Sequence, residues 1–258
     1  MNCIIFTGGN YPEKSEIIHF IEPLQSNSII IAADSGMNAA MAYDMKPDFF
    51  LGDMDSVKPE AVAWFKSFES SDKTTKTTKG APHAAHQKPQ NIETFPQDKD
   101  FSDTELAIYK AKSLGADFIV LIGGSGGRLD HLLGILELFK GRNRPDLWLA
   151  EENAVIFADT ARRSSLSISG LAEDAPVSVF PVFQTDCTDK ADKDYSCKSE
   201  NLVWPLDGLD WQSGAISLSN RRKPSTDKDG KDMPVRLNIQ KGSFIVILPL
   251  SASFSFSV

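Results

Sequence analysis

The sequence has few cysteines and no excess of positive charge. Its 258 residues include three cysteines, and 35 acidic residues outnumber 27 basic ones, which gives a formal net charge of −8. An odd number of cysteines without CxxC spacing predicts neither a disulfide framework nor a zinc site. Pairing of Cys187 with Cys197 is the less favoured alternative in a reducing compartment. The acidic balance gives no electrostatic footprint for nucleic acid or for an anionic membrane surface.

The chain also lacks long apolar runs. No run approaches the roughly 20 residues that are needed to span a bilayer, and Cys3–Phe6 is too short for the core of a signal peptide. We therefore expect a cytoplasmic protein that makes no use of a membrane. The apolar share of 41% and the charged share of 24% are typical of a globular protein, and the length allows one large domain or two ordinary ones.

The first half of the chain alternates short apolar runs with helical patterns, as a parallel sheet with crossover helices requires. Ser102, followed three positions later by Glu105, predicts a capping box, and Gly115 predicts that this helix ends near Leu114. We expect strands at Ile4–Thr7, Ile29–Ala33, Asp48–Leu51 and Phe118–Ile122, and helices at Glu13–Ile21, Met37–Tyr43 and Leu129–Phe139.

The pattern changes after about Asp146, where short alternating or fully apolar runs are separated by polar turns. They predict strands at Asn153–Ala158, Ser165–Ile168, Val177–Val182, Ala215–Leu218, Val235–Ile239 and Phe244–Leu248. The predicted fold class is α/β, with an N-terminal Rossmann-like parallel-sheet domain at residues 1–145 and a C-terminal β-sandwich or jelly-roll domain at residues 146–258. Alternatively, the first strands after the boundary belong to the α/β sheet. Residues 66–97 are polar and lack hydrophobic periodicity, so we expect a mobile insertion there.

Acidic residues follow two of the predicted strands. Asp34 comes after one strand, and Asp53 and Asp55 come after the next. Ligands bind at the carboxyl edge of open α/β sheets, and Mg²⁺ prefers carboxylate and phosphate oxygens. Taken alone, Asp53 and Asp55 are better explained by a solvated turn, but beside the other motifs a metal site is favoured. Asp34 can bind a ligand, cap the following helix, or do both.

Glycines and an arginine supply the features that a phosphate group needs. Gly36, without a side chain, permits close approach to phosphate or ribose. The glycine-rich run 123–127 leads into a predicted helix, whose N–H groups and dipole favour phosphate, although no Walker A ending is present. Arg128 can bind phosphate in a bidentate fork. Asp130 can hold that arginine, orient an attacking hydroxyl or bind metal, whereas His131 is equally well explained as an ordinary helix residue.

Asp103 lies in the first turn of its predicted helix, where the helix dipole favours a carboxylate whatever its function. That explanation does not extend to the neighbouring segment Asp98-Lys99-Asp100. Its crowded carboxylates would repel one another, which favours a bound cation. Farther along the chain, Trp204 is a candidate platform for a flat cationic ring. An isolated tryptophan in a β domain is more often part of the core, and this is our interpretation of Trp211.

The order of these motifs resembles the thiamin pyrophosphokinase family, which transfers a diphosphate from ATP to the hydroxyl of thiamin and releases AMP. The resemblance covers most of the chain, through the segments Ala33–Asn38, Gly52–Ser56, Asp98–Asp103, Gly123–His131, Leu202–Leu206 and Ile216–Asn220. It implies Mg²⁺ as cofactor, ATP and thiamin as substrates, and a homodimer with thiamin bound between the subunits.

The resemblance also implies roles for individual residues. It assigns metal binding to Asp53, Asp55 and Asp103, catalysis to Asp55, Asp103, Arg128 and Asp130, ATP binding to Asp34, Gly36, Lys99, Gly124, Gly126, Gly127 and Arg128, and thiamin binding to Trp204, Ser219 and Asn220. Two alternatives stay open. One is a related diphosphotransferase that acts on another alcohol such as a pterin, and the other is a non-catalytic protein that binds thiamin or nucleotide.

Overall fold

The computed structural model describes residues 1–52, 55–71, 91–94, 101–183, 194–224, 226 and 231–257. In chain order its elements are β1 (Asn2–Phe6), α1 (Lys14–Gln25), β2 (Ser28–Ala33), α2 (Gly36–Ala42), β3 (Phe49–Gly52), α3 (Pro59–Ser71), β4 (Asn91–Thr94), α4 (Asp103–Ser113), β5 (Phe118–Ile122), α5 (Leu129–Leu138), β6 (Leu147–Leu149), β7 (Asn153–Asp159), β8 (Ser165–Ser169), β9 (Val177–Pro181), β10 (Ser196–Glu200), the 3₁₀ helix η3 (Trp211–Ser213), β11 (Ser217–Asn220), β12 (Val235–Lys241), β13 (Ser243–Pro249) and β14 (Ser253–Ser257).

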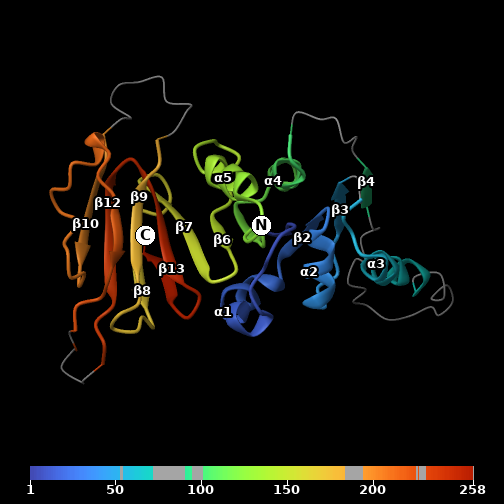
Figure 1. Cartoon of the computed structure of the whole chain (residues 1–258), viewed down its shortest axis with the longest axis horizontal. Helices are drawn as coiled ribbons and strands as arrows, with labels where there is room; N and C mark the ends of the chain where they lie inside the picture. Colours follow the sequence, from blue (N-terminus) through green and yellow to red (C-terminus); the bar gives the residue numbers. More distant parts are fainter. Residues whose placement is uncertain are drawn as a thin grey trace, which may run out of the picture.

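Within those ranges, ten strands form one continuous mixed sheet in the order β11-β9-β13-β7-β6-β5-β1-β2-β3-β4, and four others form a second sheet in the order β10-β12-β8-β14. The six neighbouring strands β6, β5, β1, β2, β3 and β4 pair in parallel, and antiparallel pairing begins where β6 meets β7. The large sheet therefore crosses the predicted boundary at residue 145 without a break. The alternative in which the first later strands extend the α/β sheet is what the structure shows (Figure 1).

The alternation of side chains along β1 sorts the helices onto two faces of the sheet. Ile4 and Phe6 belong to the core cluster that contains the buried residues of α1 and α2. Cys3 and Ile5 point the other way, into the cluster that contains the buried residues of α4 and α5. One face of the parallel part is therefore covered by α1, α2 and α3, since α3 packs beside α2 on that face, and α4 and α5 share the other face.

The C-terminal half is a sandwich of two sheets, as the short strands predict. Leu166 and Leu237 of the four-stranded sheet pack in one cluster with Ile156 and Val246 of the large sheet. Trp211 is buried, and its ring meets Phe244 edge to face at 5.1 Å, which confirms its packing role. The mixed α/β class is thus confirmed, while the detailed jelly-roll arrangement stays a prediction.

Local signals in the sequence locate α4 well and miss α3. Ser102 Oγ accepts a hydrogen bond from the Glu105 N–H at 3.2 Å, and Glu105 Oε2 accepts one from the Ser102 N–H at 2.8 Å, so the predicted capping box is present. Within the expected insertion, residues 66–71 belong to α3 and residues 91–94 form β4; the remaining positions lie outside the described residues. Among residues 59–68 of α3, whose burial is described, only Ala61 and Phe65 are fully buried, and this apolar stripe is too narrow for periodicity to reveal. None of the helices in the described ranges is long and apolar enough to cross a membrane.

Gly36 sits where α2 packs against β1 at backbone distance. A Cβ at this position would lie 2.2 Å from the Phe6 carbonyl oxygen, whereas a Cβ on Gly134 in α5 would meet nothing within 4 Å. We predict that Gly36→Ala lowers the free energy of unfolding by about 1–3 kcal/mol through overpacking. The control Gly134→Ala should raise it by about 0.5–1 kcal/mol because alanine loses less backbone entropy in a helix. Urea denaturation of both variants measures the difference, and equal stabilities would contradict the proposed backbone contact.

Candidate active site

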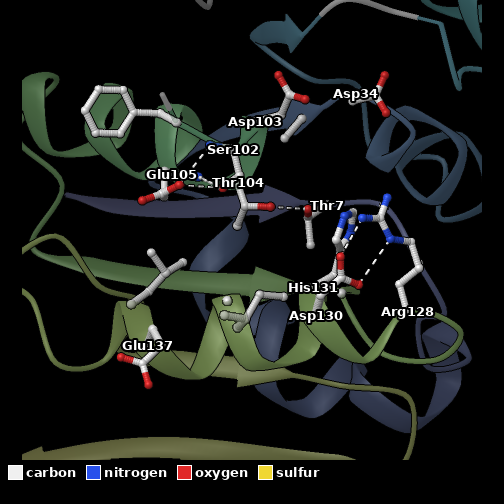
Figure 2. Close-up of a pocket in the computed structure, with 18 of the residues that line it drawn as sticks. Thr7, Asp34, Ser102, Asp103, Thr104, Glu105, Arg128, Asp130, His131 and Glu137 are labelled. Atoms are coloured by element: carbon white, nitrogen blue, oxygen red, sulfur yellow. Dashed lines mark hydrogen bonds and ion pairs between the residues drawn. The ribbon is translucent and has the colours of Figure 1, made fainter. Parts of the chain in front are cut away.

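A cavity of about 1190 Å³ opens at the carboxyl edge of the parallel strands (Figure 2). β1 lies between β2 and β5, so the chain leaves β1 in one direction and later returns to its other side. Such a switch point is where open α/β sheets bind ligands. The loops after β1, β2, β3 and β5 contribute to the lining, together with α4 on one side and α5 on the other. The fold therefore gathers at one place several motifs that are far apart in the sequence.

Two glycine loops meet at this edge through their backbones. The Gly124 N–H donates to the Gly8 carbonyl at 2.7 Å, and the Asn10 N–H donates to the Ser125 carbonyl at 2.6 Å. A Cβ on Gly9 would lie 2.7 Å from the Ser125 carbonyl oxygen, so the contact requires glycine there. The first N–H groups of the expected phosphate loop are therefore hydrogen-bonded to the protein itself. Gly124 lines the cavity, but its N–H group already has a partner.

Sequence reasoning missed the first of these loops. Thr7, Gly8, Gly9 and Asn10 all line the cavity, and Thr7 Oγ1 lies 2.6 Å from Thr104 Oγ1 in a hydrogen bond that joins the end of β1 to α4. The signal was available, since a glycine pair follows the predicted strand Ile4–Thr7 as glycines follow the other strands. The loop has no charged residue, so its sequence pattern does not predict a ligand site.

Asp34 and Asp103 come to the same cavity from different elements. Asp34 has a φ of +45° after β2; its N–H donates to the Leu51 carbonyl, and its own carbonyl accepts from the Met37 N–H. Asp103 is the first residue of α4. Figure 2 shows both carboxylates at the same end of the cavity. The N-cap of α2 is Ser35, so the alternative of Asp34 as that cap is wrong.

The remaining acidic candidates follow β3. Asp55 is exposed after β3 and accepts a hydrogen bond from Ser56 Oγ at 2.7 Å, and Ser56 lines the cavity. Asp53 and Lys99 lie outside the described residues. In the ranges that the structure describes, no three His, Cys, Asp or Glu side chains form a group that could hold a metal by themselves.

Arg128 and Asp130 form a bidentate ion pair on the cavity wall. Arg128 Nη2 lies 2.5 Å from Asp130 Oδ2, and Arg128 Nε lies 3.2 Å from Asp130 Oδ1. Both side chains are more than half exposed, at 69% and 63%. The hydrogen bond from Arg128 lowers the pKa of Asp130 to about 2, and the pKa of Arg128 is raised by the same contact. Of the three roles considered for Asp130, this geometry shows the one in which it holds the arginine.

Gly36 and the C-terminal candidates lie away from the cavity lining. Gly36 is buried, and its close approach is to β1. Trp204 is 54% exposed in the C-terminal half, with the Arg221 guanidinium 5.4 Å from its ring centroid. Ser219 is exposed with a φ of +49°. None of Trp204, Ser219 and Asn220 lines the active-site cavity of its own chain.

Asn220 holds the Trp204 segment in place. Its buried side-chain amide accepts from the backbone N–H groups of Trp204 and Arg221 and donates to the Trp204 carbonyl and to Ser217 Oγ. These four hydrogen bonds use the full capacity of the amide. The amide is therefore saturated by the protein within this chain, and a role of Asn220 in thiamin binding stays a prediction.

The sequence matches the family described as "Thiamin pyrophosphokinase, catalytic domain" over residues 20–149, which is half of the chain. The chain belongs to the thiamin pyrophosphokinase family. It is therefore an enzyme of the thiamine diphosphokinase class, as the order of the motifs predicted. No curated protein sequence matches it.

Solved structures of thiamin pyrophosphokinases share the fold. That of Bacillus subtilis has a TM-score of 0.62 at 18% identity, covering 96% of this chain and 99% of its own. That of Enterococcus faecalis has a TM-score of 0.63 at 17% identity, with 96% and 99% covered. The Candida albicans structure has a TM-score of 0.57 at 14% identity, with 96% and 89% covered. At these identities the likeness is one of fold, and it extends over the C-terminal strands.

The Arg128–Asp130 pair makes a prediction about titration. A carboxyl whose pKa is lowered in the folded state contributes stability above its ordinary pKa, here 3.8, and loses it as the pH falls through about 2. The carboxyl carbon NMR signal of Asp130 should therefore remain that of a carboxylate between pH 3 and 5. In Arg128→Gln it should titrate near the ordinary value. Asp117, whose pKa is lowered by the N-terminal ammonium, is the internal control and should not respond. A wild-type Asp130 that titrates near 3.8 would contradict the pairing in solution.

Proposed function

We propose that this enzyme transfers a diphosphate group from ATP to the hydroxyl of thiamin in the presence of Mg²⁺, and releases AMP. One observation carries the proposal: Asp34, Asp103, Arg128 and the glycine loops line a single cavity at the switch point of the sheet. These groups are what a polyphosphate and its metal need. The acidic net charge of the chain makes such local features necessary, because no general positive field attracts the nucleotide.

The donor set fits magnesium. Carboxylate oxygens are hard ligands, and Mg²⁺ is usually held by one or two of them together with substrate phosphates. In this proposal Asp103 and Asp55 bind the metal with Asp53, and Asp34 lies at the same end of the cavity as Asp103. Few carboxylates suffice where the substrate phosphates complete the set of ligands. When bound, the metal neutralises charge on the phosphate oxygens.

The protein's part in the transfer is to position and to neutralise. The thiamin hydroxyl oxygen forms a bond to the β-phosphorus of ATP and its proton passes to solvent, while the bond between that phosphorus and the bridging oxygen of AMP breaks; no cysteine or serine nucleophile takes part. In this proposal Arg128 binds the phosphate oxygens together with the N–H groups of Gly126 and Gly127, which line the same cavity, and with Lys99. Asp130 orients Arg128, and its pKa of about 2 makes it a weak base. Its contribution is therefore to the geometry of the arginine.

Thiamin recognition requires a second copy of the chain in this proposal. Trp204 and Ser219 lie in the C-terminal half and do not line the cavity that holds the phosphate-binding groups. β11 forms an edge of the large sheet, and Leu218 on that strand is 57% exposed. We propose a homodimer in which Trp204 of one subunit stacks on the thiamin that reacts in the cavity of its partner. The exposed face of Trp204 suits a flat cationic ring.

The reaction is tested by incubating the protein with Mg-ATP and thiamin and quantifying AMP and thiamin diphosphate together. Both should appear in equal amounts, and EDTA should abolish them. Asp55→Asn should lower turnover about 100-fold or more, because it removes a charge that holds the metal. The control Glu22→Gln changes an exposed carboxylate of α1 outside the cavity and should leave turnover unchanged. ADP with thiamin monophosphate as products would exclude diphosphate transfer, and near-normal turnover of Asp55→Asn would exclude the metal assignment.

The shared site is tested by mixing two inactive variants. Arg128→Ala damages the phosphate end and Trp204→Ala the thiamin end, so each homodimer should be inactive. After mixing and subunit exchange, about a quarter of the wild-type activity should return, since half of the dimers are mixed and each carries one intact site. The absence of recovery despite exchange shown by mass spectrometry, or an active monomer in light scattering, would refute the shared site.

A further inference from the structure

Two aromatic side chains line the cavity without a role in the proposed reaction. Phe101 precedes the N-cap of α4, and Tyr109 lies farther along the same helix. Both line the cavity, and they remain 46% and 42% exposed. Their rings meet edge to face, with centroids 5.5 Å apart and an interplanar angle of 79°. In such a pair one ring contributes only its edge, so its faces remain available to another planar group.

Acidic side chains occur at both ends of the cavity. Asp34 and Asp103 lie at one end with Arg128, as Figure 2 shows, whereas Glu105 and Glu137 are drawn toward the other end. Phe101 and Tyr109 line the cavity together with the apolar side chains of Ile135 and Leu138. A nucleoside triphosphate combines a charged chain, which suits the arginine and the glycine loops, with a flat base, which suits the aromatic pair.

The spacing along α4 agrees with such a ligand. Asp103 and Tyr109 are six residues apart in one helix, which corresponds to about 9 Å along its axis. A ribose and its first phosphate fill an interval of this order. The cavity volume of about 1190 Å³ also exceeds the 300–1000 Å³ that is usual for one small ligand, so a base has room beside the reacting groups.

We propose that Phe101 and Tyr109 form the platform on which the purine base of ATP stacks. The inference rests on the proposed function, because it assumes that the end of the cavity with Arg128 binds the triphosphate. It assigns the base to aromatic residues of the same chain that supplies the phosphate site. Thiamin then has its own platform at Trp204 of the partner subunit, and the two substrates approach the reacting atoms from different directions.

The experiment compares two ligands that share a triphosphate but differ in the base. Binding of Mg-ATP and of inorganic triphosphate with Mg²⁺ is measured by calorimetry for the wild type, Phe101→Ala and Phe101→Trp. Loss of a stacked base typically weakens binding about 5- to 100-fold, so Phe101→Ala should bind ATP that much more weakly. Its affinity for inorganic triphosphate should not change. Phe101→Trp should retain the affinity for ATP, since tryptophan offers a larger stacking face.

Phe183→Ala is the matched control. Phe183 is 48% exposed and meets Tyr195 edge to face at 5.0 Å, so it forms a similar pair outside the cavity. This variant should bind both ligands as the wild type does, and thermal unfolding should show that each variant remains folded.

Other outcomes overturn the inference in distinguishable ways. Unchanged ATP binding by Phe101→Ala refutes the platform, and equal loss of both ligands means that Phe101 only supports the start of α4. A raised KM for thiamin with an unchanged KM for ATP would assign the platform to the other substrate. If the wild type binds neither ligand, the proposed function fails, and this inference fails with it.

Discussion

The parallel pairing of β1 with both β2 and β5 is the constraint on which the rest of the structure depends. It brings the carboxyl ends of three strands to one edge, although the segments that follow them begin at residues 7, 34 and 123. The chain leaves β1 on one side and returns on the other, and such a switch point forms a crevice at this edge of the sheet. The resulting crevice holds the acidic residues, the glycine loops and the Arg128–Asp130 pair within one cavity.

Close backbone contact maintains this arrangement. Gly36 brings α2 against the Phe6 carbonyl, and Gly9 brings the first loop against the Ser125 carbonyl. The glycines thus act first as packing residues, and a phosphate group would meet a loop whose shape is already fixed. The same principle applies to Asn220, which holds the Trp204 backbone from both sides. In each case a residue whose own contacts lie within the protein holds a segment that is expected to meet the ligand.

Much of the fold and part of the candidate site could be predicted from the sequence. The capping box of Ser102 and Glu105 and the strand Phe118–Ile122 depend on neighbours within a few residues, so local patterns located them. The polar strand β10 escaped prediction because its burial depends on partners in β12. The Thr7–Thr104 contact escaped for the same reason, since it joins residues 97 positions apart.

The sequence by itself determined the α/β class, the order of the motifs and the family, because these depend on residue type, spacing and order along the chain. Only the tertiary structure decided that the large sheet continues through β7 into the C-terminal half, that Asp130 binds Arg128, and that Asn220 is saturated. It also decided that Trp204 lies apart from the cavity of its own chain. Hydrogen bonds and strand pairing between distant segments fix these features, and a one-dimensional pattern carries no information on which distant groups meet.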